Sequence, residues 1–180
     1  LPVLKPLLQP GTPLSVNQAA YAALAKLGNA DADALLLSAF QELLNGKLRP
    51  ELHLDVLSAA EVRQATSAPL KAARDQWLSR NPTNDPIASR AAVLKGGDAI
   101  RGGLLFKNHP QVQCLRCHKV GGDGGTVGPT LDGIGKLRDR TYLLEALVYP
   151  NKAYAEGFKP AEGGLSAMPE GLADLLTPIE

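Results

Sequence analysis

Cys114 and Cys117 are the only cysteines in the 180 residues, and they lie three positions apart. A disulfide between such close neighbours would close a very short loop, so it could not tie distant parts of the chain together. His118 follows directly, and nine of the 18 glycines fall between Gly102 and Gly135. Glycine supplies the backbone freedom that loops need to wrap closely around a rigid object. We therefore expect this segment to be loop-rich and to be organised by the chemistry of two thiols and an imidazole.

The run Cys114-Leu115-Arg116-Cys117-His118 has the C-x-x-C-H spacing of covalent c-type haem attachment. Two thiols three residues apart on a turn can each add to one vinyl group of a haem, and the adjacent imidazole then points at the iron as the proximal ligand. Two other interpretations stay open. A redox dithiol of the thioredoxin kind would need a surrounding βαβ pattern, which this sequence lacks. A closed zinc site would need four ligands, and beyond His118 only His53 and His109 remain, neither of them in a second paired motif.

Charge and composition narrow the possible partners. Lys plus Arg number 19 and Asp plus Glu number 18, which gives a formal net charge of +1, and aromatic residues make up only 4%. A balanced chain with few aromatic side chains is not expected to bind nucleic acid. Residues 6–25 carry no charge, but prolines and polar side chains interrupt them, so no transmembrane segment is predicted. No basic stretch at the start indicates a signal peptide.

The first 80 residues predict a succession of amphipathic helices, since apolar side chains recur at helical spacing. Ser15 with Gln18 fits a capping box for the first helix, and Asp31 or Asp33 suits the N-cap of the second. The expected breaks and helix starts lie near Gly28, Gly46, Pro50 and Pro69.

Short helices with one apolar face each can bury these faces by stacking in antiparallel pairs, as in an α-solenoid. Residues 1–80 resemble HEAT-type repeats, although an ordinary helical bundle would give a similar pattern. Phe40 and Trp77 are expected in its core, and His53 is expected to be structural. Residues 81–87 are rich in turn formers and are the expected linker. Beyond them we expect helices at about 88–106, at 139–148 and from Gly171.

Further motifs accompany the paired cysteines. Gly102 and Phe106 share one face of an expected helix, Gly128-Pro129-Thr130-Leu131 follows the cysteines, and Ala167-Met168-Pro169 lies near the end. Together these motifs resemble a class I cytochrome c domain, and more narrowly the planctomycete-type haem-binding domain, over residues 88–180. That family commonly places such a domain after HEAT-like repeats and a β-propeller similar to quinone-dependent sugar dehydrogenases. The resemblance thus implies an all-α chain, with a HEAT-like solenoid or helical bundle followed by a cytochrome c-like domain.

The resemblance also implies roles for particular residues. Cys114 and Cys117 would form thioethers to one haem c, and His118 would be the proximal iron ligand. The Pro129 carbonyl would accept a hydrogen bond from His118 Nδ1, which fixes the imidazole tautomer. Met168 would be the distal ligand, with a gap-filling core role as its alternative. The other implied haem contacts are Phe106, Leu131, Arg138 and Tyr142.

Some of these assignments compete with others. Arg138, with Lys136 and Arg140, could neutralise the haem propionates, and Tyr142 could donate to them, but a solvated charged face explains the same residues. His109 is a rival for the distal position, although it lies close to the attachment turn. The spacing between Gly157-Phe158 and Met168 is shorter than the resemblance leads us to expect. We therefore expect that residues are missing there or at the ends, and that the domain is incomplete at its C-terminus.

These features together favour a one-electron carrier with His/Met ligation, serving as a module of a larger dehydrogenase-type chain. Its partners would be a dehydrogenase donor and a cytochrome or oxidase acceptor. The alternatives are a haem enzyme or a gas- or peroxide-binding protein with an open distal site, and a helical-repeat scaffold with a subsidiary haem. Because covalent haem attachment normally takes place outside the bacterial inner membrane, we expect a periplasmic or exported protein.

Overall fold

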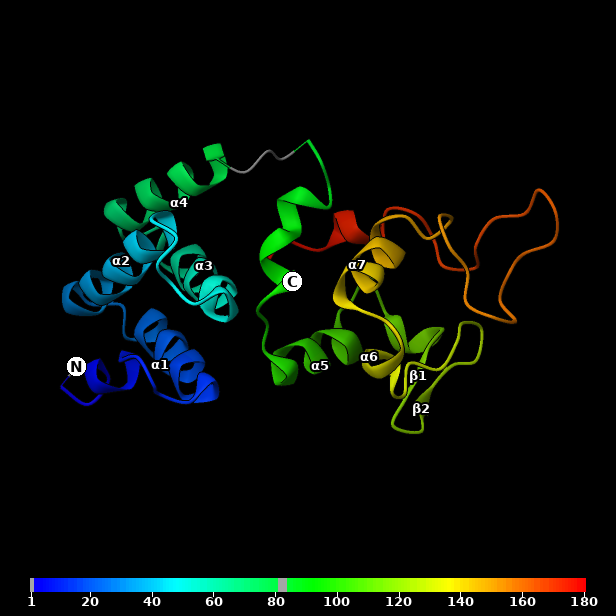
Figure 1. Cartoon of the computed structure of the whole chain (residues 1–180), viewed down its shortest axis with the longest axis horizontal. Helices are drawn as coiled ribbons and strands as arrows, with labels where there is room; N and C mark the ends of the chain where they lie inside the picture. Colours follow the sequence, from blue (N-terminus) through cyan, green and yellow to red (C-terminus); the bar gives the residue numbers. More distant parts are fainter. Residues whose placement is uncertain (1, 81–83) are drawn as a thin grey trace. The chain divides into compact units, whose positions relative to one another are not determined.

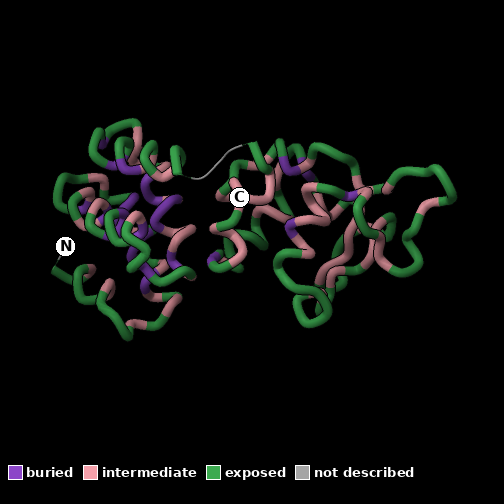
Figure 2. The backbone as a smooth tube through the Cα atoms, turned by 45° about the horizontal axis from the view of Figure 1, so that its top comes forward, coloured by how far each residue is buried: buried purple, intermediate pink, exposed green. Residues whose placement is uncertain are grey.

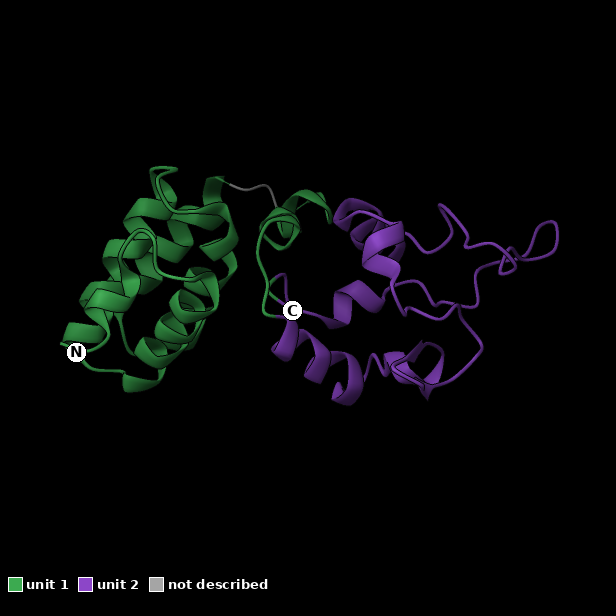
Figure 3. Cartoon of the chain, turned by 60° about the horizontal axis from the view of Figure 1, so that its bottom comes forward, with its two compact units in different colours: residues 1–98, 179 green, residues 99–178, 180 purple. Residues whose placement is uncertain are grey.

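The computed structural model describes residues 2–80 and 84–180, and it divides into two compact units (Figure 3). The first unit runs to Asp98 and includes Ile179, and the second runs from Ala99 to Pro178 and includes Glu180. Residues 81–83 of the expected linker lie outside the described residues. In the rest of it, the Asp85 carboxylate accepts the backbone N–H groups of Ile87 and Ala88, where a short helix begins.

Four α-helices form the body of the first unit (Figure 1). They are α1 (Leu14–Leu27), α2 (Ala30–Leu44), α3 (His53–Arg63) and α4 (Ala68–Arg80), with the short 3-10 helices η1 (Lys5–Leu8), η2 (Pro50–Leu52) and η3 (Ala88–Leu94). Helix α1 packs against α2 and α3, and α4 packs against α2 and α3. The predicted helical character of this region is therefore confirmed.

Hydrogen bonds show that α1 and α3 run in the same direction. Near their starts, the Gln18 amide donates to an Asp55 carboxylate oxygen at 3.2 Å. At their ends, Arg63 of α3 donates to the carbonyl of Gly28, which directly follows α1, at 3.0 Å. Consecutive helices are joined by short connections, so the unit consists of two helical hairpins lying side by side. Whether these hairpins are HEAT-type repeats stays a prediction.

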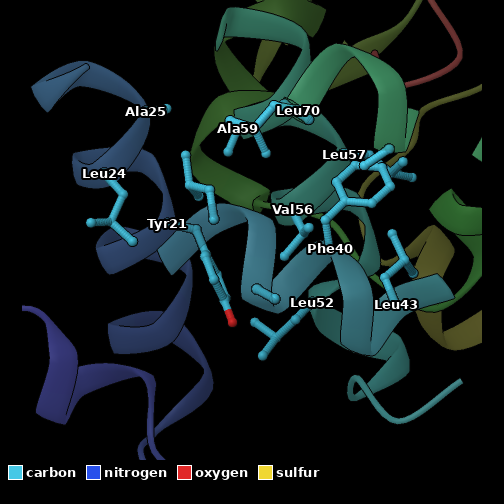
Figure 4. Packing of buried hydrophobic residues seen from close by; sticks show 14 of the residues in the cluster. Tyr21, Leu24, Ala25, Phe40, Leu43, Leu52, Val56, Leu57, Ala59 and Leu70 are labelled. Carbon is cyan, nitrogen blue, oxygen red and sulfur yellow. The ribbon is translucent and has the colours of Figure 1, made fainter. Parts of the chain in front are cut away.

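The hydrophobic core of the first unit lies between these helices (Figure 4). Phe40 and Leu24 are completely buried, and Trp77 packs against the edge of the cluster. The His53 ring lies edge-on to Trp77, with ring centroids 6.3 Å apart, and its Nε2 is 3.1 Å from the Leu48 carbonyl oxygen. Leu, Ala and Val provide most of the remaining buried surface, as expected for packed helices.

The predicted start of α1 was wrong. The helix begins at Leu14, its N-cap is Pro13, and no side chain caps it. Gln18 instead donates to Asp55 and to the Gly97 carbonyl, at 3.2 and 3.0 Å. A long-range partner therefore takes the amide that the local pattern assigned to a capping box.

The predicted N-cap of α2 was also wrong, because Asn29 takes that position and accepts the Ala32 N–H at 2.9 Å. Asp33 is instead paired with Arg63 of α3, at 2.8 Å. The predicted end of α1 is confirmed, since Gly28 ends it in the left-handed conformation at φ 58°.

The second unit contains shorter elements. They are α5 (Ala99–Asn108), η4 (Cys114–Arg116), β1 (Lys119–Val120), β2 (Asp123–Gly124), α6 (Ile134–Leu137), α7 (Arg140–Val148) and η5 (Leu172–Leu175). The two strands form an antiparallel hairpin that pairs Lys119 with Gly124 and Val120 with Asp123. Helix α7 agrees with its prediction, and the expected last helix after Gly171 is a single 3-10 turn.

The single helix expected over residues 88–106 was wrong. These residues form two separate elements, η3 and α5. Gly97 lies between them with a φ of 131°, a value that is incompatible with a helix. The backbone at Gly96 also passes so close to the Glu51 carbonyl that a Cβ would lie 2.7 Å from its oxygen. The break between η3 and α5 therefore lies where the chain passes against η2.

Burial differs between the two units (Figure 2). Among the described residues, the buried hydrophobic side chains of the second unit are Val112, Leu144 and Ala173, and Pro150 is buried with them. Other large apolar side chains of this unit are exposed, among them Ile100, Leu104, Val127, Leu137 and Leu165. Loops rather than a polypeptide core therefore dominate the second unit. None of the described helices is long and apolar enough to cross a membrane.

Candidate functional site

The two cysteines and His118 lie on one tight turn. Gln113 precedes it in the left-handed region, at φ 46°, and η4 begins at Cys114. The carbonyl of Cys114 accepts the N–H of Cys117 at 3.2 Å and the N–H of His118 at 2.9 Å. Both thiols are free and half-buried. The backbone of this turn therefore places two thiols and one imidazole within a single helical turn.

Backbone hydrogen bonds join a glycine-rich loop to this turn. The N–H of Gly125 donates to Leu115 at 2.8 Å, and the N–H of Gly128 donates to Cys117 at 2.8 Å. A Cβ at Gly125 would lie 2.1 Å from the Arg116 carbonyl oxygen, so only glycine fits there. Of the nine glycines between Gly102 and Gly135, Gly124, Gly125 and Gly128 lie close against the turn that carries Cys114, Cys117 and His118.

The imidazole of His118 is held from two sides. Its Nδ1 is 2.8 Å from the Pro129 carbonyl oxygen, and the backbone of Gly128 lies against the ring. A carbonyl can only accept, so Nδ1 carries the proton and donates. Nε2 then keeps its lone pair, and an imidazole in this state can bind a metal ion.

Burial raises the pKa of the Cys114 thiol above its ordinary value. A redox dithiol of the thioredoxin kind needs the opposite, a thiol activated by a lowered pKa. The electrostatics of the turn therefore do not favour that interpretation.

The zinc interpretation also finds no support in residues 2–80 and 84–180, because no three His, Cys, Asp or Glu side chains gather there as a metal site would require. His109 Nδ1 accepts the N–H groups of Gln111 and Val112, at 3.3 and 3.2 Å. His53 lies in the first unit beside Trp77. The donor set of the attachment turn fits a haem better: two thiols for its vinyl groups and one imidazole nitrogen for its iron.

Two of the other site candidates are brought together. The Arg138 guanidinium lies over the Tyr142 ring, 5.0 Å from its centroid. Arg138 is exposed and Tyr142 is half-buried. Asp139 between them caps α7 by accepting the Tyr142 N–H at 2.7 Å. Arg138 and Tyr142 therefore lie next to each other at the start of α7.

Phe106 and Leu131 lie on different elements. Phe106 is half-buried near the end of α5. Leu131 is half-buried in the loop after Pro129, and its N–H donates to Lys119 of β1 at 2.9 Å. This bond joins the Pro129 loop to the strand that follows His118.

Met168 lies half-buried in the loop between α7 and η5. Its N–H donates to the Ser166 hydroxyl at 3.1 Å. The Ser166 N–H donates to Asn151, and Asn151 donates to Glu170. Sequence reasoning missed Asn151 and the contact of Gly128 with His118. The one sequence signal for Asn151 was its position directly after Pro150, since proline followed by asparagine is typical of a turn.

Residues 99–177 match the sequence model of the family described as cytochrome c. The match spans the attachment turn, the Pro129 loop and Met168. It supports a class I c-type cytochrome domain, and thus a haem-binding electron-transfer protein with covalently bound haem c. No curated protein and no solved structure matches the chain.

Proposed function

We propose that this chain is a one-electron carrier with one haem c, held by Cys114 and Cys117 and ligated by His118 and Met168. The observation that carries the proposal is the orientation of His118, whose Nδ1 lies 2.8 Å from the Pro129 carbonyl directly beside the two free thiols. When bound, the haem supplies an iron that accepts and releases one electron.

The chain's own residues orient the ligand. The Pro129 carbonyl fixes the His118 tautomer and makes Nε2 more basic, which favours iron binding. Gly128 lets the backbone approach the ring closely, and its N–H bond to Cys117 joins that backbone to the attachment turn. The exposed apolar side chains of the second unit suit a large apolar cofactor as their packing partner.

Ligation by Met168 sulfur would fill the second axial position and leave none for a substrate. A thioether ligand raises the reduction potential. This favours a carrier over a peroxide- or gas-binding enzyme, which would need an open iron site and a distal acid–base group.

The helical first unit is proposed to be a HEAT-like docking surface or spacer within a larger, quinone-dependent dehydrogenase-type assembly. The side-by-side helical hairpins support the repeat interpretation. The donor would then be a dehydrogenase domain, and the acceptor a cytochrome or oxidase. Because haem c is attached outside the bacterial inner membrane, we propose that the chain works in the periplasm or is exported.

Covalent attachment is tested by producing the chain in a host with a c-type haem maturation system and measuring its intact mass. We expect one haem that stays with the polypeptide in acidified organic solvent. Cys114→Ser and Cys117→Ser should each keep the haem through the remaining thioether, with one vinyl group unreacted, and only the double variant should lose covalent retention. Colourless wild-type protein, or pigment that extracts freely, would contradict the proposal.

Axial ligation is tested separately on the purified holoprotein. Met168→Ala should give a high-spin ferric spectrum and immediate carbon monoxide binding to the reduced form. His109→Ala is the matched control, and its spectra should equal those of the wild type. Immediate carbon monoxide binding by the wild type would instead favour the open-site alternative.

A further inference from the structure

We propose that Asn151 is a positioning residue that holds Met168 in place by bonding to the chain on both sides of it. This inference rests on the proposed ligation by Met168. Asn151 Oδ1 accepts the Ser166 N–H at 2.7 Å, and its Nδ2 donates to the Glu170 carboxylate at 2.5 Å. Ser166 and Glu170 lie two positions before and two positions after Met168.

Asn151 itself is attached to a regular element. It lies three positions after Val148, the last residue of α7. In the turn between them, the Tyr149 N–H donates to Glu145 at 2.7 Å and the Lys152 N–H donates to Tyr149 at 2.9 Å. Pro150, next to it, is buried. The turn is thus fixed to α7, and the Asn151 side chain fixes the Met168 loop to the turn.

A second hydrogen bond connects Ser166 to the backbone of Met168. The Ser166 hydroxyl accepts the Met168 N–H at 3.1 Å, so the backbone of Met168 is two hydrogen bonds away from Asn151. The loop between α7 and η5 is long and has no regular structure of its own. Such a loop has many conformations, and each bond that removes some of them favours the one that presents the sulfur.

Only asparagine suits both partners at this position. Its amide oxygen accepts a backbone N–H, and its amide nitrogen donates to a carboxylate. A flipped amide would place the NH2 group against the Ser166 N–H and the oxygen against the Glu170 carboxylate. Aspartate would keep the acceptor and would set its charge against Glu170. Alanine would remove both bonds.

The test measures how readily imidazole displaces Met168 from the ferric iron of the holoprotein. Asn151→Ala should raise the apparent imidazole affinity on the order of tenfold, the effect of losing two hydrogen bonds at a partly exposed site. It should also weaken the charge-transfer absorption band of Met-ligated ferric haem. Lys159→Ala, at an exposed side chain of the same loop, is the matched control and should change neither.

A rescue variant separates positioning from general destabilisation. Asn151→Asp should raise the imidazole affinity less than Asn151→Ala, because aspartate still accepts the Ser166 N–H and loses only the bond to Glu170. Adding Glu170→Gln should restore wild-type imidazole affinity, because a neutral amide can donate to the new carboxylate. Failure of the rescue together with unchanged affinity in Asn151→Ala would overturn the positioning role.

Hydrogen exchange gives a readout that needs no iron ligation. The amides of Ser166 and Met168 should exchange faster in Asn151→Ala than in the wild type. If the wild type lacks the Met-ligated band, ligation by Met168 is wrong whatever Asn151 does. If the band is present and neither imidazole affinity nor exchange changes in Asn151→Ala, only the role of Asn151 is wrong.

Discussion

Gly128 lies against the His118 imidazole, and this contact decides which residue position 128 accepts. A Cβ there would lie 2.7 Å from Cε1 and 2.9 Å from Nδ1 of the ring. These distances are shorter than ordinary van der Waals contact, and the ring is already bonded to Pro129. Any side chain at position 128 must therefore move the imidazole or the Pro129 loop.

Gly128→Ala is expected to weaken the bond between His118 Nδ1 and Pro129 and so to make Nε2 less basic. The reduction potential of the holoprotein should rise, by about 59 mV for each tenfold loss of ligand affinity that is specific to the oxidised state. Redox titration measures this shift. Gly135→Ala is the control, since a Cβ there meets nothing within 4 Å. Equal potentials in the two variants would contradict the expectation.

The attachment motif could be read from five adjacent letters, because the chemistry of Cys114, Cys117 and His118 depends on local spacing. The contacts of Gly128 and Asn151 could not be read in this way. Gly128 contacts the ring of a residue ten positions earlier, and Asn151 bonds to the backbone of a residue fifteen positions later. Contacts of this kind depend on tertiary structure and leave no periodic pattern in the sequence.

At the scale of the elements, one guanidinium joins the ends of three helices. Arg63 at the end of α3 donates to Asp33 in the first turn of α2, at 2.8 and 3.2 Å, and to the Gly28 carbonyl beyond α1, at 3.0 Å. Both charged side chains are largely shielded from solvent. The arrangement supplies a partner for a helix-end carbonyl that would otherwise be unsatisfied.

The hydrogen bond from Arg63 holds the pKa of Asp33 below its ordinary value of 3.8. A carboxyl group whose pKa is lower in the folded state stabilises the fold above its unfolded pKa, and this stabilisation is lost as the pH falls through the folded value. The free energy of unfolding of the wild type should thus decline below about pH 4, and Asp33→Asn should flatten the decline.

Denaturant titrations at several pH values measure this dependence. Asp31→Asn is the matched control, because Asp31 lies in the same first turn of α2 but is exposed. It should keep the wild-type slope below pH 4, apart from a small helix-dipole effect. An Asp33→Asn variant with an unchanged slope would show that the pair contributes nothing to the acid dependence.

The same pair explains why element boundaries were harder to predict than the elements themselves. Asp33 is a residue type that often caps helices. Its carboxylate instead accepts a hydrogen bond from Arg63, 30 positions away, and Asn29 caps the helix. In the same way, Gln18 does not form the predicted capping box and instead donates to Asp55 and Gly97. Helical periodicity survives tertiary packing because the core itself imposes it, whereas a polar side chain takes whichever partner lies closest.

At the scale of the whole molecule, the core of the first unit is expected to depend on Phe40, which is completely buried. Phe40→Ala should lower the free energy of unfolding of this unit by about 3–5 kcal/mol. Trp77, the only tryptophan, packs on the same cluster and reports the transition by fluorescence. Val62→Ala, at a side chain that is 63% exposed, should change the value by less than about 0.5 kcal/mol. Similar losses in both variants would contradict the assigned core.

The contrast between the two units was visible in the sequence as a change from helical periodicity to glycine-rich loops. The short β1–β2 hairpin was not, because two-residue strands carry no alternating pattern. The domain limits of 1–80 and 88–180 stay a proposal, and so does the repeat character of the first unit.

The Arg63 contacts have a consequence for how the first unit opens. Fraying of α1, α2 or α3 at this end must release the same guanidinium, so none of these helix ends can loosen without disturbing the other two. Local fluctuations there should merge into one shared event, in which amides near Leu27, Asp33 and Arg63 open with a common free energy rather than three separate ones.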